Sequence, residues 1–230
     1  MNAKIIFILV LFGLSNSITA QVAPSKTGAW YMYFYRYQLK NSQFGVQGDL
    51  QYRNWNTFGD LEQLLIRSGF TFKPKNATIL FTLGYANITT GQFGYSNATT
   101  SENRVYQEAL FPQKLGKRFH LTHRFRYEQR FVENQDFRTR YRYNLFLNIP
   151  LNKDAFINNT IYIALYNELF INGQTNVGTQ APVQLFDRNR TYLGLGYVLK
   201  PSMRLQFGWM NQKTVAWGKG QMQISFHHNF

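Results

Sequence analysis

The sequence contains no cysteine, and only 6 of its 230 residues are proline. Without cysteine the protein forms neither disulfide bonds nor thiolate metal sites. Charged residues are also scarce, at 16%, and the mean hydropathy is −0.34. No segment after the first twenty residues approaches the run of about 18 apolar residues that a membrane-spanning helix needs. The composition therefore excludes a membrane protein built from helices.

Aromatic residues, in contrast, are abundant: 15 Tyr, 21 Phe and 4 Trp make up 17% of the chain. Disordered chains are poor in aromatic residues, so we expect a folded protein. In a membrane β-barrel, apolar residues alternate with polar ones, which keeps the mean hydropathy low. Two classes remain, a soluble all-β domain and a membrane β-barrel.

The N-terminus has the features of an export signal. Lys4 precedes a ten-residue apolar run (IIFILVLFGL, residues 5–14), and small and polar residues lead to Ala20. This pattern predicts a secretory signal peptide over residues 1–20, cleaved after Ala20, and a single domain over residues 21–230. An uncleaved anchor helix is the alternative, but it needs about 20 apolar residues. No cysteine follows the cleavage position, which excludes a bacterial lipoprotein.

Apolar and polar residues alternate along most of the remaining chain, as they do in β-strands. The clearest example is 118–131, where aromatic and other large residues occupy most odd positions and charged residues several even positions. No segment has a helical period. Eleven segments have the strand pattern: 29–39, 44–55, 61–72, 77–88, 103–112, 118–131, 137–149, 159–171, 188–199, 202–213 and 221–230.

The connections between these segments favour a barrel in the outer membrane of a Gram-negative bacterium. Tight, Lys-bearing turns alternate with the long polar stretches 89–102 and 172–187, and such barrels have short periplasmic turns and longer extracellular loops. The last strand ends on Phe230, facing the apolar side, which we interpret as the signal read by the barrel-assembly machinery. A secreted β-sandwich is the alternative.

We therefore predict an all-β fold, an antiparallel transmembrane β-barrel. Bacterial single-chain barrels have even numbers of strands. We expect about 12 strands, with 10 as the next choice, although eleven segments are visible. The interior of such a barrel is narrow and largely filled by side chains.

Arginine is concentrated on the polar face of these strands, where we count twelve Arg and no Lys. Arginine presents a planar fork suited to carboxylate or phosphate, and it does not lose its proton. With at most four carboxylates on the same face, we expect an excess of at least eight positive charges. The proposed ionic ladder inside the barrel consists of Arg124, Arg126, Glu128, Arg130, Arg138, Arg140, Arg142, Glu168 and Arg190.

The ladder has a specific expected register. A turn centred on Asn134 pairs Glu128 with Arg140. It also pairs Arg126 with Arg142 and Arg130 with Arg138, which are like-charged pairs that repel unless neutralised. A tight turn over 152–155 then brings Glu168 opposite Arg140 or Arg138. Arg140 is expected to lie between Glu128 and Glu168.

Three functions fit this pattern. The favoured one is structural filling of a barrel of unknown specific activity. The second is a small anion-selective porin or a binder of acidic ligands, because rings of arginine line anion pores. Its partner would be a small anionic solute. The third is an outer-membrane lipid hydrolase that uses a pair of His123 and Glu108. That mechanism also needs a nucleophile, and no Ser lies on 103–112, 118–131 or 137–149, so we do not expect an enzyme.

No cofactor or metal site is predicted. The sequence has no Gly-rich phosphate loop, zinc motif or calcium loop. His227 and His228 are adjacent in a strand and point to opposite faces, so they do not chelate one metal together. The expected partners are outer-membrane lipid, lipopolysaccharide and the assembly machinery. Nucleic acid is not expected, because the signal peptide removes the chain from the cytoplasm.

Three segments of the sequence are similar to a known bacterial family. They are RFRYEQRF (124–131), NELF (167–170) and DRNRTYLGLGY (187–197), and Trp30 and the QYR element at 51–53 add to the resemblance. In this order they resemble the family named domain of unknown function 2490, over nearly the whole mature chain. The resemblance implies a Gram-negative source of the Bacteroidetes type and an outer-membrane barrel. It implies no activity.

Overall fold

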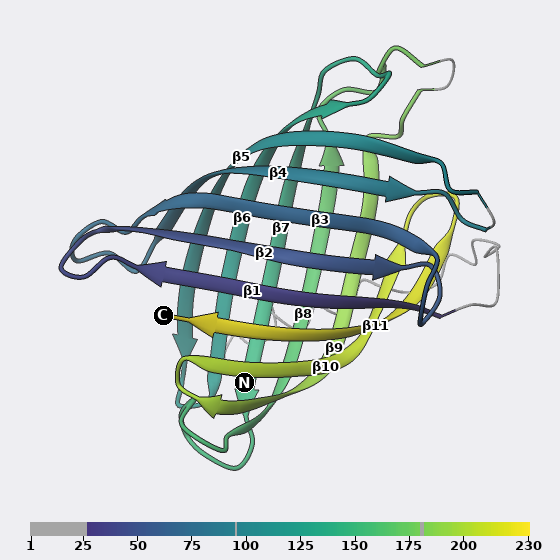
Figure 1. Ribbon diagram of the computed structural model, residues 1–230. Helices are drawn as coiled ribbons and strands as arrows, with labels where there is room; N and C mark the ends of the chain where they lie inside the picture. Colours follow the sequence, from purple (N-terminus) through teal and green to yellow (C-terminus); the bar gives the residue numbers. More distant parts are fainter. Residues whose placement is uncertain (1–26, 95, 180–181) are drawn as a thin grey trace.

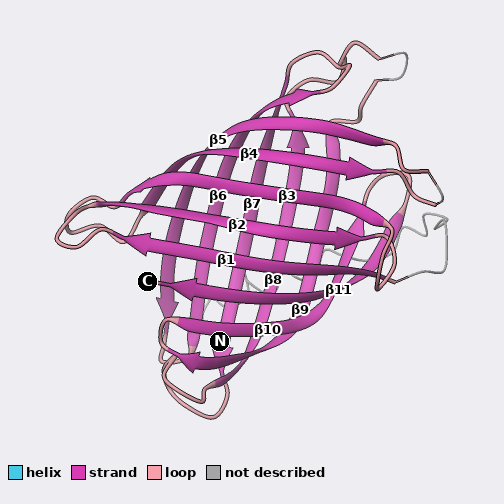
Figure 2. Ribbon diagram, in the orientation of Figure 1, coloured by secondary structure: helices cyan, strands magenta, loops and turns pink. Residues whose placement is uncertain are grey.

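The computed structural model describes residues 27–94, 96–179 and 182–230. These residues form one closed β-barrel of eleven strands (Figures 1 and 2). The predicted signal peptide lies outside the described residues. The strands are β1 (Gly28–Gln38), β2 (Phe44–Asn54), β3 (Leu61–Phe72), β4 (Leu80–Gly91), β5 (Thr99–Leu115), β6 (Phe119–Val132), β7 (Arg138–Pro150), β8 (Ile161–Asn172), β9 (Phe186–Lys200), β10 (Met203–Lys213) and β11 (Gly218–Asn229).

The eleven strands coincide with the eleven segments of alternating sequence, whose ends differ by a few residues at most. The expectation of twelve strands, or ten, was wrong for the described chain. The even-number rule assumes that the first and last strands close the barrel as antiparallel neighbours. Here β1 pairs with β11 in parallel, from Gly28 opposite Gln221 to Arg36 opposite Asn229, so no twelfth strand is needed.

Parallel closure leaves the two ends of the described chain at opposite ends of the barrel. β1 and β11 run in the same direction in Figure 1, so the start of β1 lies far from the C-terminus. We call the two mouths the Gly28 end and the Phe230 end. Since successive strands alternate in direction, the connections at the Phe230 end are 39–43, 73–79, 116–118, 151–160 and 201–202. Those at the Gly28 end are 55–60, 92–98, 133–137, 173–185 and 214–217.

The expected division into tight turns and long loops is only partly present. Half of the stretch 89–102 is strand, because β4 extends to Gly91 and β5 begins at Thr99. The turn expected over 152–155 is part of a ten-residue connection, 151–160. The longest connection between the described strands is 173–185, at the Gly28 end. None of the described residues forms a helix that is long and apolar enough to cross a bilayer.

The two faces of the barrel wall differ sharply in polarity. Large apolar side chains project outward from the strands, among them Phe70, Leu195 and Phe207, which are 77%, 57% and 57% exposed. Charged side chains of the strands occupy inward positions, with Lys213 at the end of β10 as the exception within the described strands. The alternation seen in the sequence therefore separates an apolar exterior from a charged interior, as the strand period of two requires.

Phe230 follows the last strand and points outward, 63% exposed. Its backbone N–H donates a hydrogen bond to the carbonyl of Arg36 at 2.8 Å, and its ring packs against His228 at a centroid distance of 3.8 Å. The chain terminus is thus held at the seam between β11 and β1.

Part of the interior is apolar rather than charged. Trp30, Tyr162, Tyr192 and Met210 form a buried cluster, and Tyr162 is packed over Gly196 on the neighbouring strand. A Cβ added at Gly196 would overlap the Tyr162 ring. The glycine therefore makes room for the tyrosine in a narrow barrel.

Gly196→Ala should lower the free energy of unfolding by about 1–3 kcal/mol, because the added methyl group overpacks this cluster. The matched control is Gly218→Ala, where the nearest atom to an added Cβ is 3.5 Å away. Denaturant unfolding in detergent, followed by circular dichroism, measures the difference. Equal stability of the two variants would contradict this account of the packing.

Candidate functional site

The arginine-rich positions of β6 and β7 face each other inside the barrel. The strands pair about Asn134, which adopts a left-handed conformation with φ 58°. Glu128 lies opposite Arg140, as the sequence predicts. Arg126 lies opposite Arg142, and Arg130 opposite Arg138, also as expected. The turn geometry thus places one like-charged pair on each side of one carboxylate.

Glu128 is the centre of the network and is only 1% exposed. One carboxylate oxygen accepts hydrogen bonds from Arg140 at 2.7 and 2.9 Å, and the other accepts from Arg142 at 2.5 Å. Nitrogens of Arg104 and Arg126 lie 3.8 Å from its oxygens. Charge-assisted bonds of this kind are about twice as strong as neutral ones. One carboxylate therefore holds guanidinium groups from β5, β6 and β7.

Glu168 belongs to the same network, but its expected register was wrong. It lies opposite Asn144 rather than Arg140 or Arg138. The reason is the ten-residue connection 151–160, which displaces β8 relative to a tight turn. Glu168 instead accepts hydrogen bonds from Arg142 at 2.5 and 2.9 Å and from Arg124 at 2.7 Å.

Arg140 does lie between two carboxylates, yet the second is Asp187 and not Glu168. The distance from Arg140 Nη1 to Asp187 Oδ2 is 2.8 Å. Asp187 was assigned to a loop, because a bulge between β8 and β9 near its position breaks the alternation. Asp187 also pairs with Arg188 at 3.0 Å, an interior arginine that shares the even positions of Arg190 but was left out of the expected polar face.

Glu102 is the other carboxylate that sequence reasoning placed in a loop. It accepts hydrogen bonds from Arg104 at 2.6 Å and from Arg130 at 2.5 Å. β5 begins at Thr99, so Glu102 continues the inward even positions of that strand. Its spacing of two from Arg104 was the available signal. Arg130 is therefore neutralised by Glu102.

The proposed pair of His123 and Glu108 is not formed. Glu108 lies opposite Arg126, its hydrogen-bond partner, inside the barrel. His123 lies opposite Phe111 on the outer face, where Nδ1 is 2.9 Å from the Tyr143 hydroxyl. A two-residue turn would place His123 and Glu108 opposite each other, whereas the β5–β6 connection spans three residues, 116–118. That extra residue moves Glu108 and His123 to opposite faces.

Thirteen arginines line the interior cavities: Arg36, Arg53, Arg67, Arg104, Arg124, Arg126, Arg130, Arg138, Arg140, Arg142, Arg188, Arg190 and Arg204. Seven carboxylates face them: Asp49, Glu62, Glu102, Glu108, Glu128, Glu168 and Asp187. The excess is six positive charges, below the expected eight, because Glu62, Glu102 and Asp187 were not counted on this face.

Five of these arginines have no carboxylate partner within the described residues: Arg36, Arg53, Arg138, Arg190 and Arg204. Arg53 and Arg190 are held by amides and rings instead. Arg53 donates hydrogen bonds to Gln51 and Gln63, at 2.5–3.0 Å. Arg190 donates from Nε to Gln212 at 2.7 Å.

Two buried aromatic rings complete the arginine cluster. Phe170 is 1% exposed, and the guanidinium carbons of four arginines lie 4.5–5.9 Å from its ring centroid. Trp30 contacts Arg53 at 3.8 Å and Arg190 at 4.8 Å. In the sequence, a tryptophan inside the barrel has the same appearance as one at the rim. The ring faces supply cation–π attraction to desolvated guanidiniums.

The cluster lies between two cavities. The larger one, of about 390 Å³, extends toward the Phe230 end, and we call it the Phe230-side cavity. The smaller, of about 270 Å³, is lined by residues near the Gly28 end, and we call it the Gly28-side cavity. Four arginines line both: Arg53, Arg67, Arg142 and Arg190. We call these four the arginine belt.

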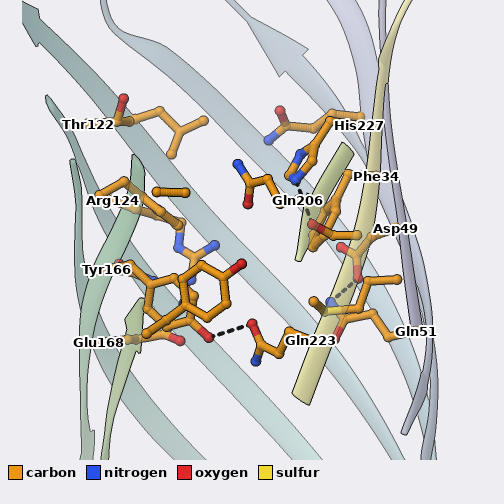
Figure 3. Close-up of a pocket in the computed structure, with 18 of the residues that line it drawn as sticks. Phe34, Asp49, Gln51, Thr122, Arg124, Tyr166, Glu168, Gln206, Gln223 and His227 are labelled. Carbon is orange, nitrogen blue, oxygen red and sulfur yellow. Dashed lines mark hydrogen bonds and ion pairs between the residues drawn. The ribbon is translucent and has the colours of Figure 1, made fainter. Parts of the chain in front are cut away.

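The Phe230-side cavity has mixed walls. Figure 3 shows Arg124 and Glu168 on one side of it and Asp49 on the other, with the Tyr166 hydroxyl donating a hydrogen bond of 3.0 Å to Gln223. Within the part of the chain that the structure describes, no three His, Asp or Glu side chains are grouped to hold a metal ion.

Replacing Glu128 by Gln should lower the free energy of unfolding by about 3–5 kcal/mol, because it leaves Arg140 and Arg142 buried beside a neutral amide. Asp154→Asn is the control. It removes an ion pair to Arg118 in which the two side chains are 71% and 49% exposed, and such pairs contribute about 0–1 kcal/mol. Denaturant titration of both variants in detergent tests the difference. A loss no larger for Glu128 than for Asp154 would show that the network does not stabilise the barrel.

The comparisons with known proteins give a family but no activity. The model of the family described as "Protein of unknown function (DUF2490)" matches residues 27–223, which include β1 to β10 and part of β11. No curated protein and no solved structure matches the chain. The segments that suggested the resemblance supply Glu128, Glu168, Phe170 and Arg190, and these converge in the barrel interior. The chain belongs to this family of proteins of unknown function, DUF2490.

Proposed function

We propose that this protein is an integral barrel of the outer membrane of a Gram-negative bacterium. The carrying observation is the segregation of charge: the strands present apolar and aromatic side chains outward and their charged side chains inward. Apolar side chains on the exterior are stable in contact with lipid, whereas charged side chains there are not. A soluble barrel would need polar residues on its exterior. The sequence pattern of a signal peptide supports export to this membrane.

Within that membrane, the ionic network acts as an internal support that closes the barrel. Six side chains form ion pairs with one another and so link strands β5, β6, β7 and β8: Glu102, Glu128, Glu168, Arg104, Arg140 and Arg142. These side chains are at most 8% exposed. Water and solutes therefore find no wide bore past the arginine belt. We propose no enzymatic activity for this arrangement.

A second candidate, the passage of small anions, is favoured by one further observation. The arginine belt lines both cavities, and Arg53 and Arg190 have no carboxylate partner in the described chain. A narrow constriction of uncompensated arginine attracts anions and repels cations. The closed-barrel and anion-passage functions differ only in whether the belt opens.

The exterior can be tested by placing a charge on it. Leu195→Arg puts a cation on an outward position in the central part of β9, and should destabilise the folded barrel in lipid by about 2–4 kcal/mol. Val215→Arg is the control, since Val215 is 59% exposed in the connection 214–217 and outside the strands. Folding into lipid vesicles at increasing urea measures both. Equal folding of the two variants, or release of the wild type from native membranes by alkaline carbonate, would contradict membrane insertion.

Planar bilayers test the interior. We expect the wild type to give a conductance well below that of an open porin, because the belt and its carboxylates occupy the barrel cross-section. Any current that does flow should be carried by anions, measured as the sign of the reversal potential in a salt gradient. The reversal potential of Arg53→Gln, which changes an arginine of the belt, is compared with that of Arg124→Gln. Arg124 lines the Phe230-side cavity but is not part of the belt. Cation preference would contradict anion passage and leave the structural support as the function of the arginine-lined interior.

A further inference from the structure

The Gly28-side cavity has an unusually one-sided lining. Nine arginines contribute to its wall: Arg53, Arg67, Arg104, Arg130, Arg138, Arg140, Arg142, Arg188 and Arg190. Glu102 is the one acidic residue in that lining. The cavity volume is about 270 Å³, enough for a small solute and far too little for a macromolecule. We propose that this cavity binds a small solute that carries one or two phosphate groups.

The first argument is charge. Five carboxylates form ion pairs with any of these nine arginines: Asp49, Glu102, Glu128, Glu168 and Asp187. Even if every one is credited fully to this cavity, and Glu62 is added as a counter-charge for Arg53, three positive charges have no counter-charge in the described residues. Arginine does not escape this cost by losing its proton, and an unpaired charge in a barrel interior is costly. A bound polyanion supplies the missing charge.

The second argument is the supply of free donors. Arg138 Nε is buried and has no hydrogen-bond partner in the described residues. Arg190 is 7% exposed, and within the described residues it donates only through Nε, to Gln212. Its two terminal nitrogens are therefore available. Unused guanidinium nitrogens in one small cavity match the several acceptor oxygens of a phosphate group, which arginine binds with two parallel bonds.

The third argument is access. Thr100 is exposed and Thr90, Val132, Arg138 and Arg188 are partly exposed at the Gly28 end of the cavity. Deeper in the barrel the cavity ends at the arginine belt. The solute therefore enters from the Gly28 end. The Phe230-side cavity is a weaker candidate, because Asp49, Glu108 and Glu168 line it together with its arginines.

One part of this inference rests on the proposed function, namely the side of the membrane from which the solute enters. Binding itself can be measured on purified barrel in detergent, by isothermal titration with sodium pyrophosphate and, separately, with glucose 1-phosphate. Every titration is run in a chloride buffer of the same ionic strength, so that the screening of charges by salt is the same throughout. Tighter binding of pyrophosphate would identify free inorganic phosphates as the ligand class, and tighter binding of the sugar ester would identify phosphorylated saccharides.

Arg138→Gln is the diagnostic variant, because it removes an unpaired arginine without leaving a carboxylate stranded. Loss of one charge-assisted contact should weaken binding at least about tenfold. Arg204→Gln is the matched control: it also removes an interior arginine without a carboxylate partner, but Arg204 lines only the Phe230-side cavity and the mouth next to it. We expect its affinity to be unchanged within about twofold. Arg138→Lys, which keeps the charge and loses the fork, serves if the glutamine variant does not fold.

Two results would overturn the proposal. One is no binding of either phosphate compound above the chloride background in folded wild type. The other is equal weakening by the Arg138 and Arg204 variants, which would remove the specificity for the Gly28-side cavity. Neither result depends on the membrane experiments, since a barrel can insert in lipid without binding phosphate and can bind phosphate in detergent wherever it resides.

Discussion

The constraint on which this structure depends is that an arginine inside a closed barrel keeps its charge. A buried lysine or carboxylate can become neutral, whereas guanidinium remains protonated. Each interior arginine therefore requires a carboxylate, an amide, a ring face or a bound anion. The arrangement of Glu128 between Arg140 and Arg142, at 2.5–2.9 Å, is the most complete solution within the protein. Arg138 and Arg190 are the least complete.

This constraint explains why the network crosses strands rather than following one. β6 and β7 pair Arg126 with Arg142 and Arg130 with Arg138, which places like charges directly opposite one another. The carboxylates that neutralise them come partly from other strands, Glu102 and Glu108 from β5 and Glu168 from β8. Four strands are thereby joined through side chains in addition to their backbone hydrogen bonds. A narrow barrel makes this possible, since the walls are within reach of one another.

The same geometry connects stability with function. Glu128 and its partners join neighbouring strands of the barrel wall, while the arginine belt and the Gly28-side cavity retain positive charge that the described residues do not balance. A protein selected only for a filled interior could have used apolar residues, which often stabilise as well as buried ion pairs do. Retaining unpaired arginines around a 270 Å³ cavity is better explained by an anionic ligand.

The sequence by itself determined the strands, the inward face and the hairpin about Asn134. Period-two alternation fixes which side chains share a face, and a short turn fixes the register of its two strands, so the opposition of Glu128 and Arg140 followed from the residues. Tertiary structure decided what depends on longer connections and on closure. The ten residues 151–160 set where Glu168 lies, and a bulge turned Asp187 inward. The parallel seam between β1 and β11, which makes the strand number odd, joins residues nearly two hundred positions apart, and no local pattern encodes that pairing.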